Sequence, residues 1–291
     1  MPVLNREDKH FPQALLSIRP LVHHLSISGM EQAGRAGRLF GKRLLTVVGS
    51  RKMTRYGQQV VEKLIPPLVR AGVTIVSGFM YGVDQYVHQI TLDEAGLTMA
   101  VLGWGIDWPV LPVERRLYDA ISQKGLLISE YPNQTKPQLW MFPARDRIMA
   151  GLSPATLVIE AAKKSGSLIT ARLASRYRRK VFAVPGPITS AVSAGTNSLI
   201  KSGQALAVDS SVEILAIMGW PLSPQTTPRG CYGLIEKSKA LNFLANEPLT
   251  IDELAKKCQQ PVAQISADLS LLQIKGLVNE DNGKYFLKQL C

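Results

Sequence analysis

From residue 44 onward, short apolar runs alternate with stretches in which apolar positions recur at helical spacing. Each run is apolar on both faces, as in strands that helices cover on both sides. The six predicted strands are LLTVVG (44–49), VTIVSG (73–78), TMAVLG (98–103), GLLISE (125–130), ATLVIEA (155–161) and KVFAVPG (180–186). The helices predicted between them span 56–71, 82–95, 113–123, 143–151 and 167–178. This alternation predicts a Rossmann-like α/β fold, a doubly wound and mostly parallel sheet over residues 39–218.

Three further segments flank this pattern. Residues 1–38 are short, polar and basic, with only a hint of amphipathic spacing, and we expect an N-terminal arm or extension without a clear core of its own. The stretch GWPLSPQTTPRGCYG (219–233) is rich in Pro, Ser, Thr and Gly and predicts a linker.

Residues 234–291 predict a second, small domain. A helix is expected around 236–245, and Thr250 and Glu253 are spaced as a capping box that opens the next helix. A helix over 261–274 and two short strands, GLVNE and KYFLK, joined by the turn 281–283, complete the order of a winged helix.

Composition narrows the class of protein. With 291 residues, 46% of them hydrophobic, the chain can bury one large core or two unequal ones. The three cysteines and four histidines have neither zinc-site nor disulfide-framework spacing, so we expect no metal and no cofactor. The start of the chain lacks a signal-peptide core, and no apolar run approaches about 18 residues. We therefore expect a cytoplasmic protein that does not act at a membrane.

The formal net charge of +12 is unevenly distributed. Residues 1–60 carry ten Lys or Arg against three acids, and residues 136–180 carry ten against two. Residues 231–291 carry seven of each. Positive charge of this kind favours polyanion binding, with a merely solubilising surface as the alternative. Because the excess coincides with glycine-rich segments of the α/β domain, it favours a nucleic-acid site there.

Three glycine-rich or basic segments are candidate nucleic-acid contacts. Gly49, Ser50 and Arg51 end the first strand, where backbone N–H groups and a guanidinium can hold a phosphate. The turn fits neither GxGxxG nor a Walker A loop, and an ordinary strand-to-helix connection is the alternative. A second turn, Lys164-Ser165-Gly166-Ser167, combines a lysine and hydroxyls with the start of a helix.

The segment FPARDR (142–147) is the third candidate. Phe142 can offer a stacking face to a base, and Arg145 and Arg147 can hold successive phosphates. Alternatively, either arginine pairs inside the fold with Asp146, Glu130 or Glu160.

The loop SGFMYGVD (77–84) and His88 are a further candidate ligand-binding site. The alternative is that Asp84 caps a helix and that a neighbour satisfies His88. All these loops follow strands, and in an open α/β sheet ligands bind at the carboxyl ends of the strands.

Eight motifs, in order over about residues 44–215, resemble the DNA-processing protein A (DprA/Smf) family. They are VVGSRKMTRYG, IVSGFMYGVD with His88, AVLGWGID, LLISEYP, FPARDRIMAGLS, VIEAAKKSGSLITA, VFAVPGPI and GTNSLIKSG. Two departures stand out: Asp146 replaces the usual Asn of FPxRNR, and SGFMYGVD is bulkier than the usual SGxAxGID.

The resemblance implies single-stranded DNA binding on the Rossmann-like domain, homodimers, and loading of a RecA-type recombinase during natural transformation. It also implies the DNA contacts Ser50, Arg51, Phe142, Arg145, Arg147 and Lys164, and a C-terminal winged helix like that of many members.

Two other classes of protein are alternatives to a single-stranded DNA-binding protein. A nucleotide phosphoribohydrolase of the lysine-decarboxylase-like (LOG) type would carry PGGxGTxxE, whereas here Pro185-Gly186-Pro187 and Gly195-Thr196-Asn197 have no nearby Glu. A winged-helix transcription regulator needs several basic or amide side chains facing the bases, but the predicted recognition helix offers Lys275 at its end and carries Asp268. The chain also lacks a recognisable catalytic constellation, so we expect no enzyme and no catalytic residues.

Overall fold

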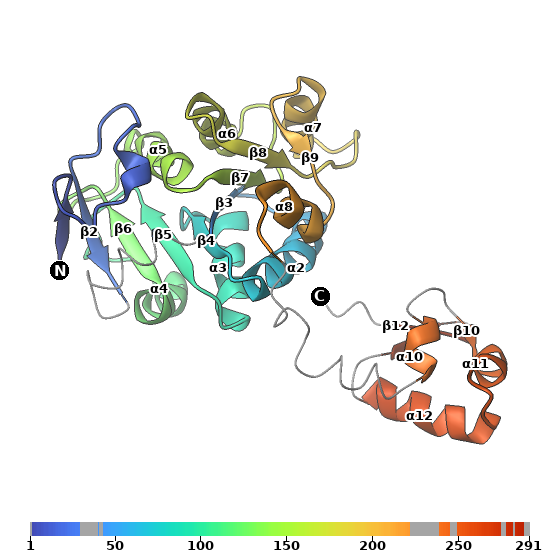
Figure 1. Cartoon of the computed structure of the whole chain (residues 1–291). Helices are drawn as coiled ribbons and strands as arrows, with labels where there is room; N and C mark the ends of the chain where they lie inside the picture. The colour runs from blue at the N-terminus through green and yellow to red at the C-terminus, as the bar shows by residue number, and fades with distance from the viewer. Residues whose placement is uncertain are drawn as a thin grey trace. The chain divides into compact units, whose positions relative to one another are not determined.

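The computed structural model describes residues 2–29, 40, 43–221, 239–244, 249–274, 278–281 and 283–287. The chain divides into two compact units, Met1–Ser223 and Pro224–Cys291 (Figure 1).

A nine-stranded sheet forms the centre of the first unit, in the order β1-β2-β6-β5-β4-β3-β7-β8-β9. Strands β3 to β9 are parallel to one another, whereas β2 is antiparallel to both β6 and β1. The strands are β1 (Val3–Asn5), β2 (His24–Ser28), β3 (Leu44–Val48), β4 (Thr74–Ser77), β5 (Thr98–Leu102), β6 (Leu126–Ser129), β7 (Ala155–Val158), β8 (Lys180–Ala183) and β9 (Leu206–Ala207). The six predicted strands are all present, and the Rossmann-like prediction is confirmed.

Helices cover both faces of this sheet (Figure 1). Successive side chains of a strand point to opposite faces of the sheet, and both faces are apolar here. In β5, Val101 packs into the core on one face and Leu102 into the core on the other. One face carries α5 (Met141–Leu152), α6 (Ser167–Arg176) and α7 (Ala194–Lys201). The other face carries α2 (Arg55–Arg70), α3 (Val83–Asp93), α4 (Pro112–Lys124) and α8 (Ser211–Met218). The five helices predicted for this unit are present, and β9, α7 and α8 are additional.

The N-terminal segment is built into this unit, which differs from the expected arm. Strands β1 and β2 extend the sheet, and a short 3₁₀ helix, η1 (Gln13–Leu15), lies between them. Leu15, Ile18 and Leu25 are fully buried in the core that α5 shares. Partners more than 100 residues away in sequence complete this core, so the local pattern alone does not reveal it. The expected boundary at residue 38 falls on residues outside those described.

The second unit is a winged helix, as predicted. Helices α10 (Lys239–Leu244), α11 (Ile251–Cys258) and α12 (Val262–Ile274) pack with a small sheet in the order β10-β12-β11. Its strands are β10 (Leu249–Thr250), β11 (Val278–Asp281) and β12 (Lys284–Leu287). The capping box is confirmed, because Thr250 Oγ1 accepts the Glu253 N–H at 3.3 Å and Glu253 accepts the Thr250 N–H at 2.8 Å.

Several predicted features of the C-terminal half fall outside the described residues. They are most of the linker (222–233), the ends of the first helix (236–238 and 245), Asn282 of the turn, Lys275, Cys231 and Cys291. Cys258 is described and is buried.

The strand order reverses between β3 and β7, and this reversal positions the site. From β3 the chain adds β4, β5 and β6 on one side, and from β7 it adds β8 and β9 on the other. The loops after β3 and β7 therefore diverge, which opens a crevice at their carboxyl ends.

Candidate nucleic-acid interface

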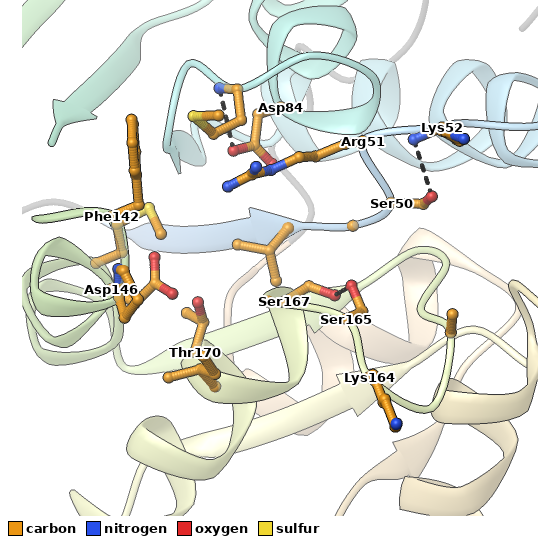
Figure 2. Close-up of a pocket in the computed structure, with 18 of the residues that line it drawn as sticks. Ser50, Arg51, Lys52, Asp84, Phe142, Asp146, Lys164, Ser165, Ser167 and Thr170 are labelled. Carbon is orange, nitrogen blue, oxygen red and sulfur yellow. Dashed lines mark hydrogen bonds between the residues drawn. The ribbon is translucent and has the colours of Figure 1, made fainter. Parts of the chain in front are cut away.

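A cavity of about 510 Å³ occupies the crevice after β3 and β7 (Figure 2). The loops after β3, β4 and β7 line it, together with the first turns of α5 and α6. Nine of the ten residues predicted as DNA contacts line this cavity: Gly49, Ser50, Arg51, Phe142, Arg145, Lys164, Ser165, Gly166 and Ser167. Arg147 does not line it.

The loop after β3 holds its shape through close packing. A side chain on Gly49 would come within 2.5 Å of Val83, so only glycine fits against the start of α3. The Ser50 hydroxyl accepts the Lys52 N–H at 3.0 Å. The next residue, Arg51, is exposed, and its guanidinium is available to a ligand at the cavity.

The start of α6 forms the opposite wall. Ser165 Oγ and Ser167 Oγ lie 2.8 Å apart, and Lys164 is exposed beside them (Figure 2). Nothing lies within 4 Å of the position that a side chain on Gly166 would take, so a ligand can approach the backbone there. In the first turn of α6, the N–H groups of Leu168 and Ile169 donate to the carbonyl oxygens of Ser165 at 3.2 Å and Gly166 at 2.8 Å. The N–H groups of Gly166 and Ser167, at the positive end of the helix dipole, suit a phosphate.

Phe142 stands at another side of the cavity. Its ring packs edge-on against Trp104, with 6.0 Å between the ring centroids. The Arg51 guanidinium lies 5.7 Å from the Phe142 ring centroid. The cavity therefore presents a half-buried aromatic ring next to a cation, the combination on which a base and its phosphate can bind.

Arg145 is a buried part of the fold, with 2% of its surface exposed. Its Nη1 donates to the carbonyl oxygens of Gly78 and Val101, and its Nε lies 3.2 Å from Asp146 Oδ1. A side chain on Gly78 would lie 2.1 Å from Nη1, which explains the glycine at that position. Arg145 is therefore paired inside the fold at the cavity floor, which is the alternative to a phosphate contact.

Arg147 is also paired inside the fold, away from the cavity. It forms an ion pair with Glu130 and donates to the carbonyl oxygens of Pro20 at 3.2 Å and Leu21 at 3.3 Å. These bonds tie α5 to the N-terminal segment. The third acid considered as a partner, Glu160, instead accepts the N–H of Thr54 at 3.0 Å and also its hydroxyl, at the start of α2.

Two carboxylates, Asp84 and Asp146, line the same cavity as Arg145. Burial raises the pKa of Asp84 to about 6 against the lowering effect of Arg145. Burial likewise raises the pKa of Asp146 to about 6, although Arg145 lowers it, and the charge of Asp84 adds to the rise. Asp84 accepts the N–H of Met80 at 3.4 Å, while Gly82 is the N-cap of α3. The proximity of Asp84 to Asp146 is not predictable from the sequence, because 61 residues separate them and no pattern links the two segments.

His88 lies outside the cavity lining and is fully buried. Its Nδ1 lies 2.6 Å from Thr98 Oγ1, and burial lowers its pKa to about 3, so it is neutral. The expectation that a neighbour satisfies His88 holds for Nδ1, whereas the buried Nε2 has no hydrogen-bond partner in the described part of the chain. Within the described ranges, no three His, Cys, Asp or Glu side chains gather as metal ligands would. No helix there is long and apolar enough to cross a bilayer.

The part of the chain that follows β7 is strongly basic. Between Glu160 and Asp209 the chain has no acidic residue. This stretch contains α6, β8 and α7, and seven of its cations are exposed: Lys163, Lys164, Arg172, Arg176, Arg178, Lys180 and Lys201. Lys163 and Lys164 precede α6 at the cavity edge of the sheet, whereas Arg176, Arg178 and Lys180 lie at the end of α6 and the start of β8, at the opposite edge.

Comparison with known protein families gives two matches that together cover most of the chain. The profile described as DNA recombination-mediator protein A matches residues 2–219. The profile described as DprA winged helix domain matches residues 236–284.

Individual relatives agree with these matches. Protein Smf of Synechocystis is 31% identical over 98% of this chain and 80% of its own length. Protein Smf of Escherichia coli is 37% identical over 85% of this chain and 68% of its own length. The putative DNA processing protein DprA of Mycobacterium tuberculosis is 34% identical over 84% of this chain and 64% of its own length.

Two solved structures resemble the fold closely. DNA processing protein A of Streptococcus pneumoniae superposes with a TM-score of 0.69 at 37% identity, covering 74% of this chain and 73% of its own. The Helicobacter pylori protein, whose structure was described for its single-stranded DNA binding mode, superposes with a TM-score of 0.65 at 26% identity, covering 75% and 96%.

Proposed function

This chain belongs to the DNA recombination-mediator protein A family, and from that membership we propose that it binds single-stranded DNA in the cavity after β3 and β7. The bound strand would then be passed to a recombinase. The observation that carries the proposal is that one cavity holds phosphate-binding groups and a stacking ring together: Arg51, the start of α6, and Phe142.

The two kinds of group bind different parts of the DNA strand. Arg51, Lys164 and the N–H groups around Ser167 hold phosphates, and the face of Phe142 stacks with a base. Both contacts are available in any single strand, whereas a duplex keeps its bases paired and stacked. Single strands should therefore bind more tightly than duplex DNA of the same length.

Fluorescence anisotropy with a labelled oligothymidylate tests this proposal. Binding should be tight at low salt and should weaken steeply as salt rises, because phosphate contacts release counterions. Arg51→Glu should weaken binding, whereas Arg116→Glu on α4, an exposed cation outside the cavity lining, is the matched control. The proposal fails if the wild-type protein does not bind at low salt.

We further propose that the protein acts by binding rather than by catalysis, as a cytoplasmic homodimer that loads a RecA-type recombinase during natural transformation. Loading is tested by the rate at which such a recombinase assembles on single strands already covered by a single-strand-binding protein. A higher rate with the wild type than with Arg51→Glu supports the mediator role, and equal rates contradict it. Incubation with nucleoside monophosphates, followed by detection of free base, tests the absence of hydrolysis.

A further inference from the structure

The cavity after β3 and β7 has two chemically different ends (Figure 2). The hydroxyls of Ser50, Ser165 and Ser167 and the N–H groups at the start of α6 gather at one end, where they can donate hydrogen bonds to an anion. In Figure 2, Lys164 belongs to the same loop, with its side chain directed away from Ser50. Asp84 and Asp146 line the other part, beside Phe142. Ionised carboxylates only accept hydrogen bonds.

The two carboxylates are nearly buried and reach the cavity from different elements. Asp84 comes from α3 and is 7% exposed, whereas Asp146 comes from α5 and is 8% exposed. Both face Arg145 from the cavity floor. The Arg51 guanidinium lies over the Phe142 ring at the same end, and like Arg145 it lowers the pKa of Asp146. The two guanidinium groups balance the charge of the two carboxylates, whose oxygens remain hydrogen-bond acceptors for a ligand.

A planar group with N–H donors fits the carboxylate end. Phe142 offers the half-buried face of its ring, and Met80, Met149 and Ile169 add apolar walls. A cavity of about 510 Å³ lies within the range of pockets that hold small organic ligands, roughly 300–1,000 Å³. The dimensions and the polarity together suit one nucleotide, with its phosphate at the donor end and its base at the acceptor end.

We propose that the carboxylate end selects a guanine base, whose N1–H and N2–H groups both donate to Asp146 or Asp84. Guanine alone among the DNA bases places two adjacent donors on one edge. Adenine and cytosine offer one exocyclic amine beside an acceptor nitrogen, and thymine offers one N–H between two carbonyl oxygens, which a carboxylate repels. This preference concerns one base in a bound strand and rests on the proposed binding of single-stranded DNA.

Oligonucleotides with a single changed base test the proposal. A nonathymidylate is compared with strands in which the central base is guanine, hypoxanthine, adenine or cytosine, each titrated by anisotropy. Guanine should tighten binding by about fivefold or more over thymine, the effect of one good bidentate contact. Hypoxanthine keeps N1–H but lacks the N2 amine, so it should lose most of that gain.

Asp146→Asn and Asp84→Asn show whether the carboxylates cause the preference. Each variant should bind the guanine strand with a smaller advantage over the thymine strand, because an amide offers a donor where the base needs an acceptor. Asp93→Asn, an exposed acid on the same helix as Asp84, is the matched control and should keep the wild-type preference. A thermal melt of each variant establishes that it is folded.

The outcomes separate this inference from the proposed function. If the nonathymidylate binds but all five strands bind equally, the guanine preference is wrong and DNA binding stands. If guanine is preferred and both Asp variants retain the preference, the assignment to these carboxylates is wrong. If no strand binds at low salt, the proposed function itself fails.

Discussion

The Arg51 guanidinium lies 5.7 Å from the centre of the Phe142 ring, although the two residues are 91 positions apart in sequence. This contact joins the loop after β3 to the first turn of α5 across the mouth of the cavity. A strand bound there can stack a base on the ring while the adjacent phosphate meets the guanidinium.

Phe142→Ala should weaken binding of an oligothymidylate, because it removes the stacking face. Loss of one base–aromatic stack costs about 1–3 kcal/mol, a weakening of roughly 5- to 150-fold. Phe142→Tyr keeps an aromatic face and should bind close to the wild type. Equal weakening by both variants, measured by anisotropy at fixed salt, would show that the ring acts through packing against Trp104 instead.

Arg145→Ala should lower the free energy of unfolding by about 3–5 kcal/mol, because it leaves Asp84 and Asp146 buried without their shared cation. It also removes the donors to the carbonyl groups of Gly78 and Val101. Urea unfolding measures the loss. Arg116→Ala on α4 is exposed and should change stability by less than about 0.5 kcal/mol. A loss for Arg145→Ala as small as that of the control contradicts the structural role assigned to this arginine.

The stability difference between the wild type and Asp146→Asn should depend on pH. The folded state raises the pKa of Asp146 from 3.8 to about 6, so it holds the proton more tightly than the unfolded chain does. This contribution to stability is fully present below the unfolded pKa and is lost as pH rises through about 6. The wild type should therefore lose stability relative to Asp146→Asn as pH rises from 4 to 7.

Urea unfolding of both proteins across that pH range provides the check. His88 has an opposite effect, because its pKa is lowered to about 3 and protonation of the unfolded chain destabilises the fold as pH falls below 6.5. His88 is present in both proteins, so its contribution cancels in the difference. The difference reports Asp146 together with the change that its charge causes in the titration of the neighbouring Asp84. A difference that does not change with pH means that Asp146 titrates normally.

A chain that ends at Ser223 should keep most of its affinity for single-stranded DNA. All the residues that line the cavity lie in the first unit. Residues 231–291 have no net charge, and α12 carries no Lys or Arg. We expect the dissociation constant for an oligothymidylate to change by less than about tenfold, well below the loss for Arg51→Glu. A larger loss would place DNA contacts on the winged helix.

Much of the α/β unit is predictable from sequence because each buried strand and helix carries its own apolar pattern. The run from Leu44 to Val48 is buried throughout, and such a run between helical stretches has few other structures open to it. Strands β1 and β2 are not predictable from local sequence because their burial depends on partners that are distant along the chain. Ser26 and Ile27 of β2, for example, pair with Ser129 and Ile128.

Site residues were predictable where one short motif contains all the groups that a phosphate-binding turn needs. The glycine, the hydroxyl and the cation of Gly49-Ser50-Arg51 follow one another at a strand end, and the structure places all three at the cavity. Arg145 and Arg147 are only two residues apart, yet one lies at the cavity floor and the other pairs with Glu130. Local sequence does not decide between a phosphate and an internal carboxylate as the partner of an arginine, because that depends on which loops the fold brings near.

The salt dependence of DNA binding tests the central claim most directly, because it counts phosphate contacts at the cavity. The dissociation constant for an oligothymidylate is measured at several salt concentrations for the wild type and for Arg51→Ala with Lys164→Ala. Each lost phosphate contact should reduce the slope of log affinity against log salt by about 0.7 for a single strand. We predict a slope that is shallower by about 1.4 in the double variant. An unchanged slope would contradict the placement of single-stranded DNA in the cavity after β3 and β7.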